Sequence, residues 1–271
     1  MSTATTTAPE QTAPGPFAQP RRRRRLRGSG RLSDVLAPLV LFLVLGALWE
    51  WVAYHNRSLI PPIESVVADM ADRPDYYAAQ LWETLQSALI GLVIGVSAGI
   101  VLAIGIVHVR FLRSAVMPIA LLINVTPIVA ISPALIVAFG FTRTPHIIVV
   151  TLGVFFPMLI NATAGLRAVD PQAMEVFSVM SASKLDVLTR LRFPTSVPYL
   201  FAGLRTSASM AMLGAIISEF TGTNKGLGAS ITLAMSYLNL SQLWGAIFLS
   251  ALTSMALLGI VALAERLTVR W

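Results

Sequence analysis

The residues of this chain that could carry out acid, base or nucleophilic chemistry do not form a catalytic pattern. The chain has no cysteine, which excludes both disulfides and thiolate metal sites. Its three histidines, His55, His108 and His146, are scattered and lack the nearby carboxylates or hydroxyls that a triad or metal site needs. The sequence therefore predicts no catalytic residue and no metal site.

Nucleotide-binding chemistry is also missing. Only two lysines occur, Lys184 and Lys225, and neither ends the glycine-rich loop that holds phosphates in nucleotide-binding proteins. The glycine-rich stretch 222–228 instead predicts a connection between two apolar helices. We therefore expect no cofactor on this chain.

The most informative polar stretch is 167–197. Asp170 is a favourable N-cap residue and Pro171 suits the first helical position, so a helix should begin here and continue to about Met180. Three small residues, 181–183, then predict a turn. The stretch thus starts as a short helix that ends at a tight bend.

A second helix is expected after the bend, from Lys184 to Phe193, and should end at Pro194 and Pro198. Its leucines recur at helical spacing on one side, while its charged residues occupy the others. An amphipathic helix of this kind suits a groove on a partner protein. The stretch therefore predicts a protruding two-helix loop that docks onto another protein.

Long apolar blocks must position these residues. Hydrophobic residues make up 55% of the chain and charged residues only 12%, with a mean hydropathy of +0.73. About 20 apolar residues are needed for a helix to cross a bilayer, and uniform apolar runs without alternation exclude a β-barrel. The prediction is an all-α integral membrane protein with about six transmembrane helices over 34–271. The expected spans are 35–54, 85–107, 115–139, 146–165, 198–220 and 243–264.

The basic residues predict the topology of these spans. If both termini lie in the cytoplasm, sixteen of the 20 Lys and Arg residues fall on cytoplasmic segments, as the positive-inside rule requires. The remaining four, Arg57, Arg73, Arg143 and Lys225, then lie outside. The chain is thus expected to be a multi-pass protein of the bacterial inner membrane, with the 167–197 loop in the cytoplasm.

The N-terminal residues 1–33 should form a disordered, basic cytoplasmic tail, because their composition cannot bury a core. The arginine cluster that precedes the first span suits topology control and contact with anionic lipid. A nucleic-acid arm is the alternative, and the adjacent membrane span argues against it. A short amphipathic helix is expected at about 63–70, on the outer surface.

Glycines in the second span predict close helix packing. Gly91, Gly95 and Gly99 recur at four-residue spacing, which brings small residues to one face and lets a second helix approach. The partner is either another span of this chain or a second copy. These glycines are therefore packing residues rather than chemical ones.

Breaks and charges within the spans mark candidate pathway or gate residues. Asn124, Pro127 and Pro133 interrupt the third span, and such interruptions occur in kinked packing helices and in helices that line a pathway. Glu219 lies near the outer end of the fifth span, where it either snorkels to the membrane interface or takes part in the outer gate. Arg205 lies farther inside that span and either snorkels to the cytosol or closes the inner mouth.

The 167–197 stretch resembles the EAA loop of permease subunits from bacterial ATP-binding-cassette (ABC) importers. Glu175 begins the motif, Ser181 stands at the usual glycine, and Pro194 ends it, all at the family's spacing. The two alanines that usually follow the glutamate are here Val176 and Phe177. Further stretches resemble the nitrate, sulfonate and taurine branch: 155–161, which ends in the candidate pathway residue Asn161, 198–205, 219–222 and 225–228.

This resemblance implies a specific assembly. Two permease chains would pair, each docking its loop onto a cytoplasmic ATPase, while an extracytoplasmic substrate-binding protein delivers the solute to the outer face. Glu175, Lys184, Asp186 and Arg190 would hold the ATPase. The turn residues of the loop would be Ser181, Ala182 and Ser183, and Pro194 would close the motif.

Two other functions remain as alternatives, an ion-coupled secondary transporter and a membrane scaffold that recruits an enzyme. For the importer, the expected solute is a nitrate-, sulfonate- or taurine-like anion or a thiamin-pyrimidine precursor, with the 155–161 and 221–228 patterns favouring the latter by resemblance. Whether the two permeases are identical stays open, with a homodimer preferred. The other expected contacts are membrane lipids, and no nucleic acid.

Overall fold

The computed structural model describes residues 31–56, 59–109, 111–112, 114–116, 118, 128–221 and 223–269. Every named element in these ranges is a helix, so the all-α prediction is confirmed for them. The elements are α1 (Arg31–His55), α2 (Ile63–Asp72), α3 (Pro74–His108), η1 (Ile128–Ile131), α5 (Ser132–Phe139), α6 (Thr144–Arg167), α7 (Pro171–Val179), α8 (Lys184–Asp186), η2 (Val187–Arg192), α9 (Phe193–Glu219), α10 (Leu227–Ser236) and α11 (Leu240–Thr268).

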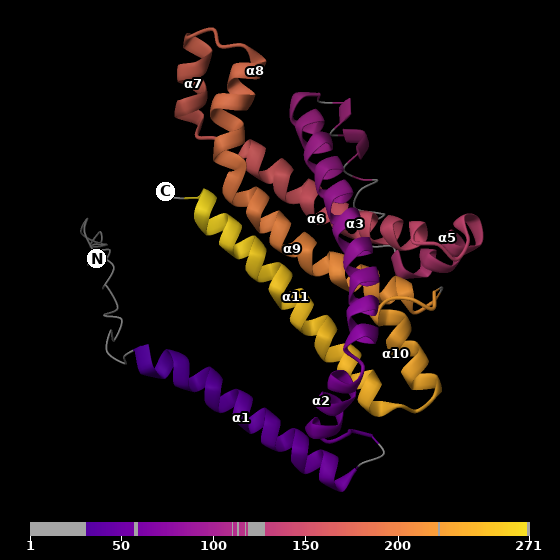
Figure 1. The fold of residues 1–271 in the computed structure, drawn as a ribbon. Coiled ribbons are helices and arrows are strands. Elements are labelled where there is room, and N and C mark those ends of the chain that lie inside the picture. Colours follow the sequence, from indigo (N-terminus) through magenta and orange to yellow (C-terminus); the bar gives the residue numbers. More distant parts are fainter. Residues whose placement is uncertain are drawn as a thin grey trace, which may run out of the picture. The chain divides into compact units, whose positions relative to one another are not determined.

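The chain forms two compact units, Met1–Leu48 and Trp49–Trp271. The described residues of the first unit form the first part of α1, a helix that contains Pro38. The second unit holds the packed helices, and all sites described below lie within it. Figure 1 shows α7 and α8 near one end of α9 and α10 near its other end.

Five helices of the described residues are long and apolar enough to cross a membrane, and they match five of the six predicted spans. They are Leu36–His55, Pro74–His108, Thr144–Arg167, Lys184–Glu219 and Leu240–Thr268. The remaining predicted span, 115–139, stays a prediction, because 117 and 119–127 lie outside the described residues. The candidate pathway residues Asn124 and Pro127 fall in this part. Its described end comprises η1 and α5, with Pro133 exposed in the first turn of α5.

The helix that contains the second predicted span begins at Pro74, well before residue 85. The added turns carry polar side chains that find partners in other helices instead of apolar ones that face lipid. Tyr76 donates a hydrogen bond from its hydroxyl to Ser230 Oγ of α10 (3.0 Å) and accepts one from Gln242 Nε2 of α11 (2.9 Å). Hydropathy alone therefore ended the helix too early at its polar end.

The second loop helix was expected to end at Pro194 and Pro198. It does not, so this expectation was wrong. The helix continues from Lys184 through α8, η2 and α9 to Glu219. A proline removes one N–H donor and crowds the carbonyl four residues before it. The π-helical turn η2 comes directly before Pro194 and widens the helix where that crowding would occur. The loop and the fifth span are thus one continuous helical rod.

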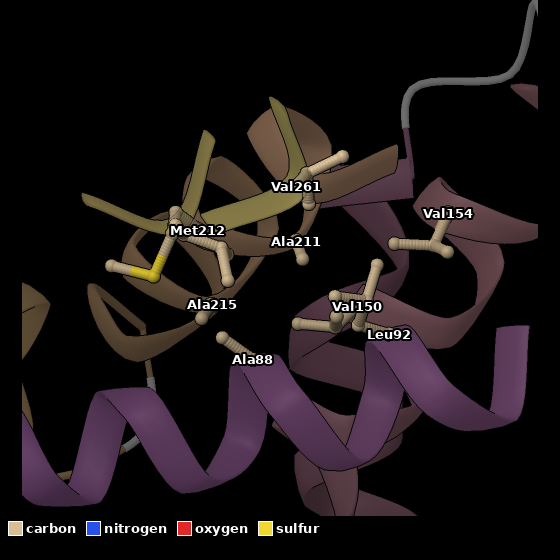
Figure 2. Close-up of a cluster of buried hydrophobic side chains, with 10 residues drawn as sticks. Ala88, Leu92, Val150, Val154, Ala211, Met212, Ala215 and Val261 are labelled. Carbon is tan, nitrogen blue, oxygen red and sulfur yellow. The ribbon is translucent and has the colours of Figure 1, made fainter. Parts of the chain in front are cut away.

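The core of the second unit lies where α3, α6, α9 and α11 meet (Figure 2). Its side chains are mostly alanine, valine and other small or branched groups, which allow close helix packing where lipid supplies no hydrophobic drive. A Cβ added at Gly91 would lie 2.5 Å from Val150 Cγ1, and one at Gly95 would lie 2.7 Å from the Thr151 carbonyl oxygen. The glycines of α3, including Gly99, therefore lie against α6 of the same chain.

The short helix expected at about 63–70 is present as α2, with Val66 buried. The last turns of α1 are fixed beside it, because Trp49 Nε1 donates to the Pro61 carbonyl (3.0 Å) and the Ile63 N–H donates to Glu50 Oε1 (2.8 Å). Trp49 also meets Trp244 of α11 edge to face, with ring centroids 4.4 Å apart. These contacts hold the α2 end of the second unit together.

Candidate functional site

The first candidate site is the α7–α8 segment, residues 168–192. The Asp170 carboxylate accepts a hydrogen bond from the Gln172 N–H (3.0 Å) and Pro171 occupies the first helical position, so the predicted helix start is confirmed. No residue of α7, α8 or η2 is buried. Most side chains of the segment are therefore open to solvent, while Leu188 of η2 packs against the core cluster that contains Leu166.

Ser181 sits at a backbone position that normally requires glycine. Its φ is +52°, in the left-handed region. The Ala182 N–H donates to the Phe177 carbonyl (3.0 Å) and the Ser181 N–H to the Ser178 carbonyl (3.0 Å), the two bonds of a Schellman cap. The family glycine at this position thus has a physical reason, and serine occupies it here at some strain.

The charged residues after the turn are bonded locally. Ser183 Oγ accepts from the Asp186 N–H (3.1 Å) and donates to Asp186 Oδ2 (2.5 Å), which caps α8. Asp186 also pairs with Arg190 at 3.4 Å, while Glu175 lies exposed on α7. Local contacts thus hold Asp186, on a surface where Glu175 and Arg190 are exposed.

The second candidate site is the Glu219 cluster, formed by Gln80, Thr84, Glu219 and the first residues of α10. Glu219 is only 2% exposed, and its Oε2 accepts hydrogen bonds from Thr84 Oγ1 (2.9 Å) and from the Gly228 N–H (2.9 Å). A carboxylate at a helix N-terminus satisfies otherwise unpaired N–H groups and matches the helix dipole. Glu219 therefore fixes the start of α10.

Residues of α3 complete this cap. The Leu227 N–H donates to Thr84 Oγ1 (2.7 Å), and the Gly226 N–H donates to Gln80 Oε1 (2.6 Å). Gly226 has a φ of +104°, and a Cβ there would collide with the Glu219 carboxylate, so only glycine fits. Side chains from α3 and α9 thus cap the N-terminus of α10.

A cavity of about 790 Å³ opens beside the Glu219 cluster. Arg143 pairs with Glu83 across it (2.5 Å), which neutralises both charges. His146 is 3% exposed; its Nδ1 lies 3.1 Å from Ser218 Oγ, and its Nε2 has no hydrogen-bond partner among the described residues. The other lining residues are Ser87, Phe141, Thr142, Glu219, Phe220, Thr221, Thr223, Asn224, Lys225 and Thr232.

The sequence predicted only one residue of this cavity, Glu219. Glu83, Arg143 and His146 were missed, and the first of them falls in the polar start of α3 that hydropathy did not assign to a span. The spacing of charged residues held no signal for the Arg143–Glu83 pair, since its members lie on different helices. The cavity is a product of tertiary packing.

The other predicted pathway residues lie elsewhere. Arg205 forms an ion pair with Glu265 of α11, with 2.6 Å between the charged atoms. Neither predicted role of Arg205, snorkelling to the cytosol or closing the inner mouth, included this partner. Asn161 Nδ2 donates to the Pro157 carbonyl (2.8 Å), and a Cβ added at Gly203 of α9 would lie 2.9 Å from Asn161 Cβ. Both residues thus lie at helix–helix contacts. In the described ranges no group of three or more histidines or carboxylates could hold a metal.

Comparison with known proteins now identifies the family. Residues 91–268 match the family described as the inner membrane component of binding-protein-dependent transport systems. The chain belongs to this family. It is therefore the permease of an ABC importer and not an enzyme, in the nitrate, sulfonate and taurine branch. Such permeases work with a separate ATPase and a substrate-binding protein, which disfavours the alternatives of secondary transporter and scaffold.

Individual relatives show how far the permease resembles known transporters. It is 32% identical over 164 residues to a riboflavin transport system permease protein of Chloroflexus aurantiacus, covering 60% of this chain and 61% of the relative's length. It is 29% identical to a formylaminopyrimidine transport permease protein of Halalkalibacterium halodurans, over 86% of this chain and 93% of the relative. A taurine transport system permease protein of Escherichia coli is 26% identical, over 90% and 94%.

Proposed function

We propose that the permease pairs with a second copy of itself and that each α7–α8 segment docks onto a cytoplasmic ATPase subunit. The exposed Glu175, Asp186 and Arg190 would contact the ATPase, and the cap at Ser181 would hold the two helices at a fixed angle. Because the second loop helix continues into α9, movement of the docked segment would pass directly along a membrane span. This unbroken helical range is the observation that most supports coupling through the segment.

In this proposal both termini lie in the cytoplasm and the Glu219 cluster faces the outside. Residues 84–108 of α3 separate the Glu219 cluster from the α8 end by about 36 Å, at roughly 1.5 Å per residue. This exceeds the bilayer core of about 30 Å, so the two sites would face opposite sides of the membrane. ATP and Mg²⁺ would bind to the partner ATPase, and no cofactor would bind to this chain.

For the solute we propose a polar heteroaromatic compound of the pyrimidine type, delivered to the outer cavity by a substrate-binding protein. Two relatives named for heteroaromatic solutes, riboflavin and formylaminopyrimidine, support this class. The cavity supports it as well: Phe141 and Phe220 offer ring faces, and its many hydroxyls offer hydrogen bonds. Arg143 pairs with Glu83, and Glu219 offsets the charge of Lys225 in the same lining, so the cavity has no net positive charge that would favour a taurine-like anion.

Reconstituted uptake tests this proposal. The permease, its ATPase and its binding protein would be placed in proteoliposomes, and ATP-dependent uptake of labelled formylaminopyrimidine would be compared with uptake of taurine and nitrate. We expect formylaminopyrimidine uptake to exceed that of both anions. Preferred uptake of taurine or nitrate would overturn the solute proposal, and uptake that continues without the ATPase would overturn the coupling proposal.

A further inference from the structure

A second, smaller cavity of about 230 Å³ lies where the end of α3 meets the α7–α8 segment. It is distinct from the outer cavity in position and in charge. Apolar side chains form part of its wall, and the rest is basic. The lining residues are Val107, His108, Ala182, Lys184, Val187 and Arg192.

The charge of this cavity is unbalanced. Lys184 and Arg192 are both cations, and none of the described residues that line the cavity is a carboxylate. Asp186, the acidic residue nearest in sequence, is engaged by Ser183 and Arg190. The ion pairs formed by the described residues include neither Lys184 nor Arg192. Two cations that share a small cavity without a counter-charge favour an anionic ligand.

Hydrogen-bonding groups remain available there. Arg192 Nη1 donates to the Leu166 carbonyl (2.8 Å), which fixes the side chain and leaves its other N–H groups for a ligand. His108 Nδ1 must donate to the Ile104 carbonyl (2.8 Å), since a carbonyl oxygen only accepts, so Nε2 of the neutral ring is an acceptor and offers an oxyanion no hydrogen bond. The anchored arginine and the lysine together suit a tetrahedral oxyanion with several acceptor atoms.

The position of the cavity indicates the source of the anionic group. His108 is the last residue of α3, so the cavity lies at the end of a membrane-spanning helix, with Val107 and Val187 beside the basic groups. A basic pocket with apolar neighbours at a bilayer surface suits the phosphate of a lipid headgroup, whose acyl chains stay among apolar side chains. A free phosphate ion would match the charges but would not use the apolar wall.

We propose that this cavity binds a phosphate group, with Lys184 and Arg192 as its ligands, and that an anionic phospholipid headgroup supplies it. Lys184 would then bind the phosphate group. Its role would differ from that of Glu175, Asp186 and Arg190, which lie on the exposed surface of the segment. A lipid bound here would connect the end of α3 to the segment that moves with α9. This inference depends on neither the solute nor the ATPase contacts.

Titration calorimetry on the full-length permease in an uncharged detergent tests the site. The probes are dihexanoyl phosphatidylglycerol, dihexanoyl phosphatidylcholine and inorganic phosphate. We expect phosphatidylglycerol to bind more tightly than phosphatidylcholine, and Lys184→Gln to weaken it about tenfold, since a charge-assisted hydrogen bond is lost. The matched control is Lys225→Gln, which removes the chain's other lysine and should leave the affinity unchanged.

Further variants and probes distinguish a loss of charge from a loss of fold, and lipid binding from binding of free phosphate. Lys184→Arg keeps the charge and should keep binding, and circular dichroism of each variant verifies the fold. Equal binding of inorganic phosphate and phosphatidylglycerol, both weakened by Lys184→Gln, would support the phosphate site and overturn the lipid source. Phosphatidylglycerol binding that is unchanged in folded Lys184→Gln, or equally weakened in Lys225→Gln, would overturn the site itself.

Discussion

The α7–α8 segment and the Glu219 cluster are built in opposite ways. Bonds within the segment join residues close in sequence, as in the Ser181 cap and the Ser183–Asp186 pair, and its helices bury no side chain. Three bonds within the cluster join residues 135 to 146 positions apart, a fourth joins Glu219 to Gly228 nine positions on, and the central carboxylate is buried. The segment has a local structure suited to docking, whereas the cluster holds three helices in place.

This difference predicts which property each site controls. Exposed local bonds add little to stability because water replaces them readily. Buried hydrogen-bonding groups cost far more when a partner is lost, since they remain desolvated and unpaired. Changes in the segment should therefore reduce transport with little loss of stability, and changes in the cluster should reduce stability first.

The largest expected effect is the loss of transport in Glu175→Lys. Reversing this exposed charge should abolish ATP-dependent uptake in proteoliposomes, because the residue would contact the ATPase directly. Thermal unfolding in detergent should stay close to that of the unchanged protein. Glu64→Lys, an exposed charge reversal on α2, is the matched control and should keep uptake. Normal uptake by Glu175→Lys would count against docking through the segment.

Removal of the buried carboxylate should have the next largest effect. Glu219→Ala leaves the buried Gly228 N–H without an acceptor and Thr84 Oγ1 with only the more distant Gln80 carbonyl (3.3 Å), and we expect a loss of about 3 kcal/mol in the free energy of unfolding. Glu219→Gln keeps the volume and one acceptor oxygen, so it should cost only about 1 kcal/mol. Denaturant unfolding in detergent micelles measures both. Equal and small losses would show that the cluster does not stabilise the fold.

The smallest expected effect is a gain of stability at the loop turn. Ser181→Gly relieves the left-handed backbone strain and should stabilise the segment by up to about 1 kcal/mol. Ser178→Gly, placed inside α7 where φ is helical, should instead lose about 0.5–1 kcal/mol. Amide hydrogen exchange of α7 distinguishes the two. Slower exchange in Ser178→Gly than in Ser181→Gly would contradict the assigned cap.

Much of the fold was predictable because its signals are local. Apolar length indicated five of the spans, and Asp170 with Pro171 indicated the start of α7. The spacing from Glu175 to Pro194 indicated the importer family, which the family comparison confirmed. Two local rules failed for identifiable reasons. Hydropathy missed the polar turns at the start of α3, and a π-helical turn carries the chain through Pro194.

By itself the sequence determined that the chain spans a membrane, where its exposed two-helix segment lies and which family it belongs to, because each depends on neighbouring residues. Only the tertiary structure decided that Glu219 caps α10, that Arg143 meets Glu83 and that Arg205 meets Glu265. Composition and spacing fix the length and polarity of a helix, but not which faces of distant helices meet. Those contacts follow from how the helices pack against one another in three dimensions.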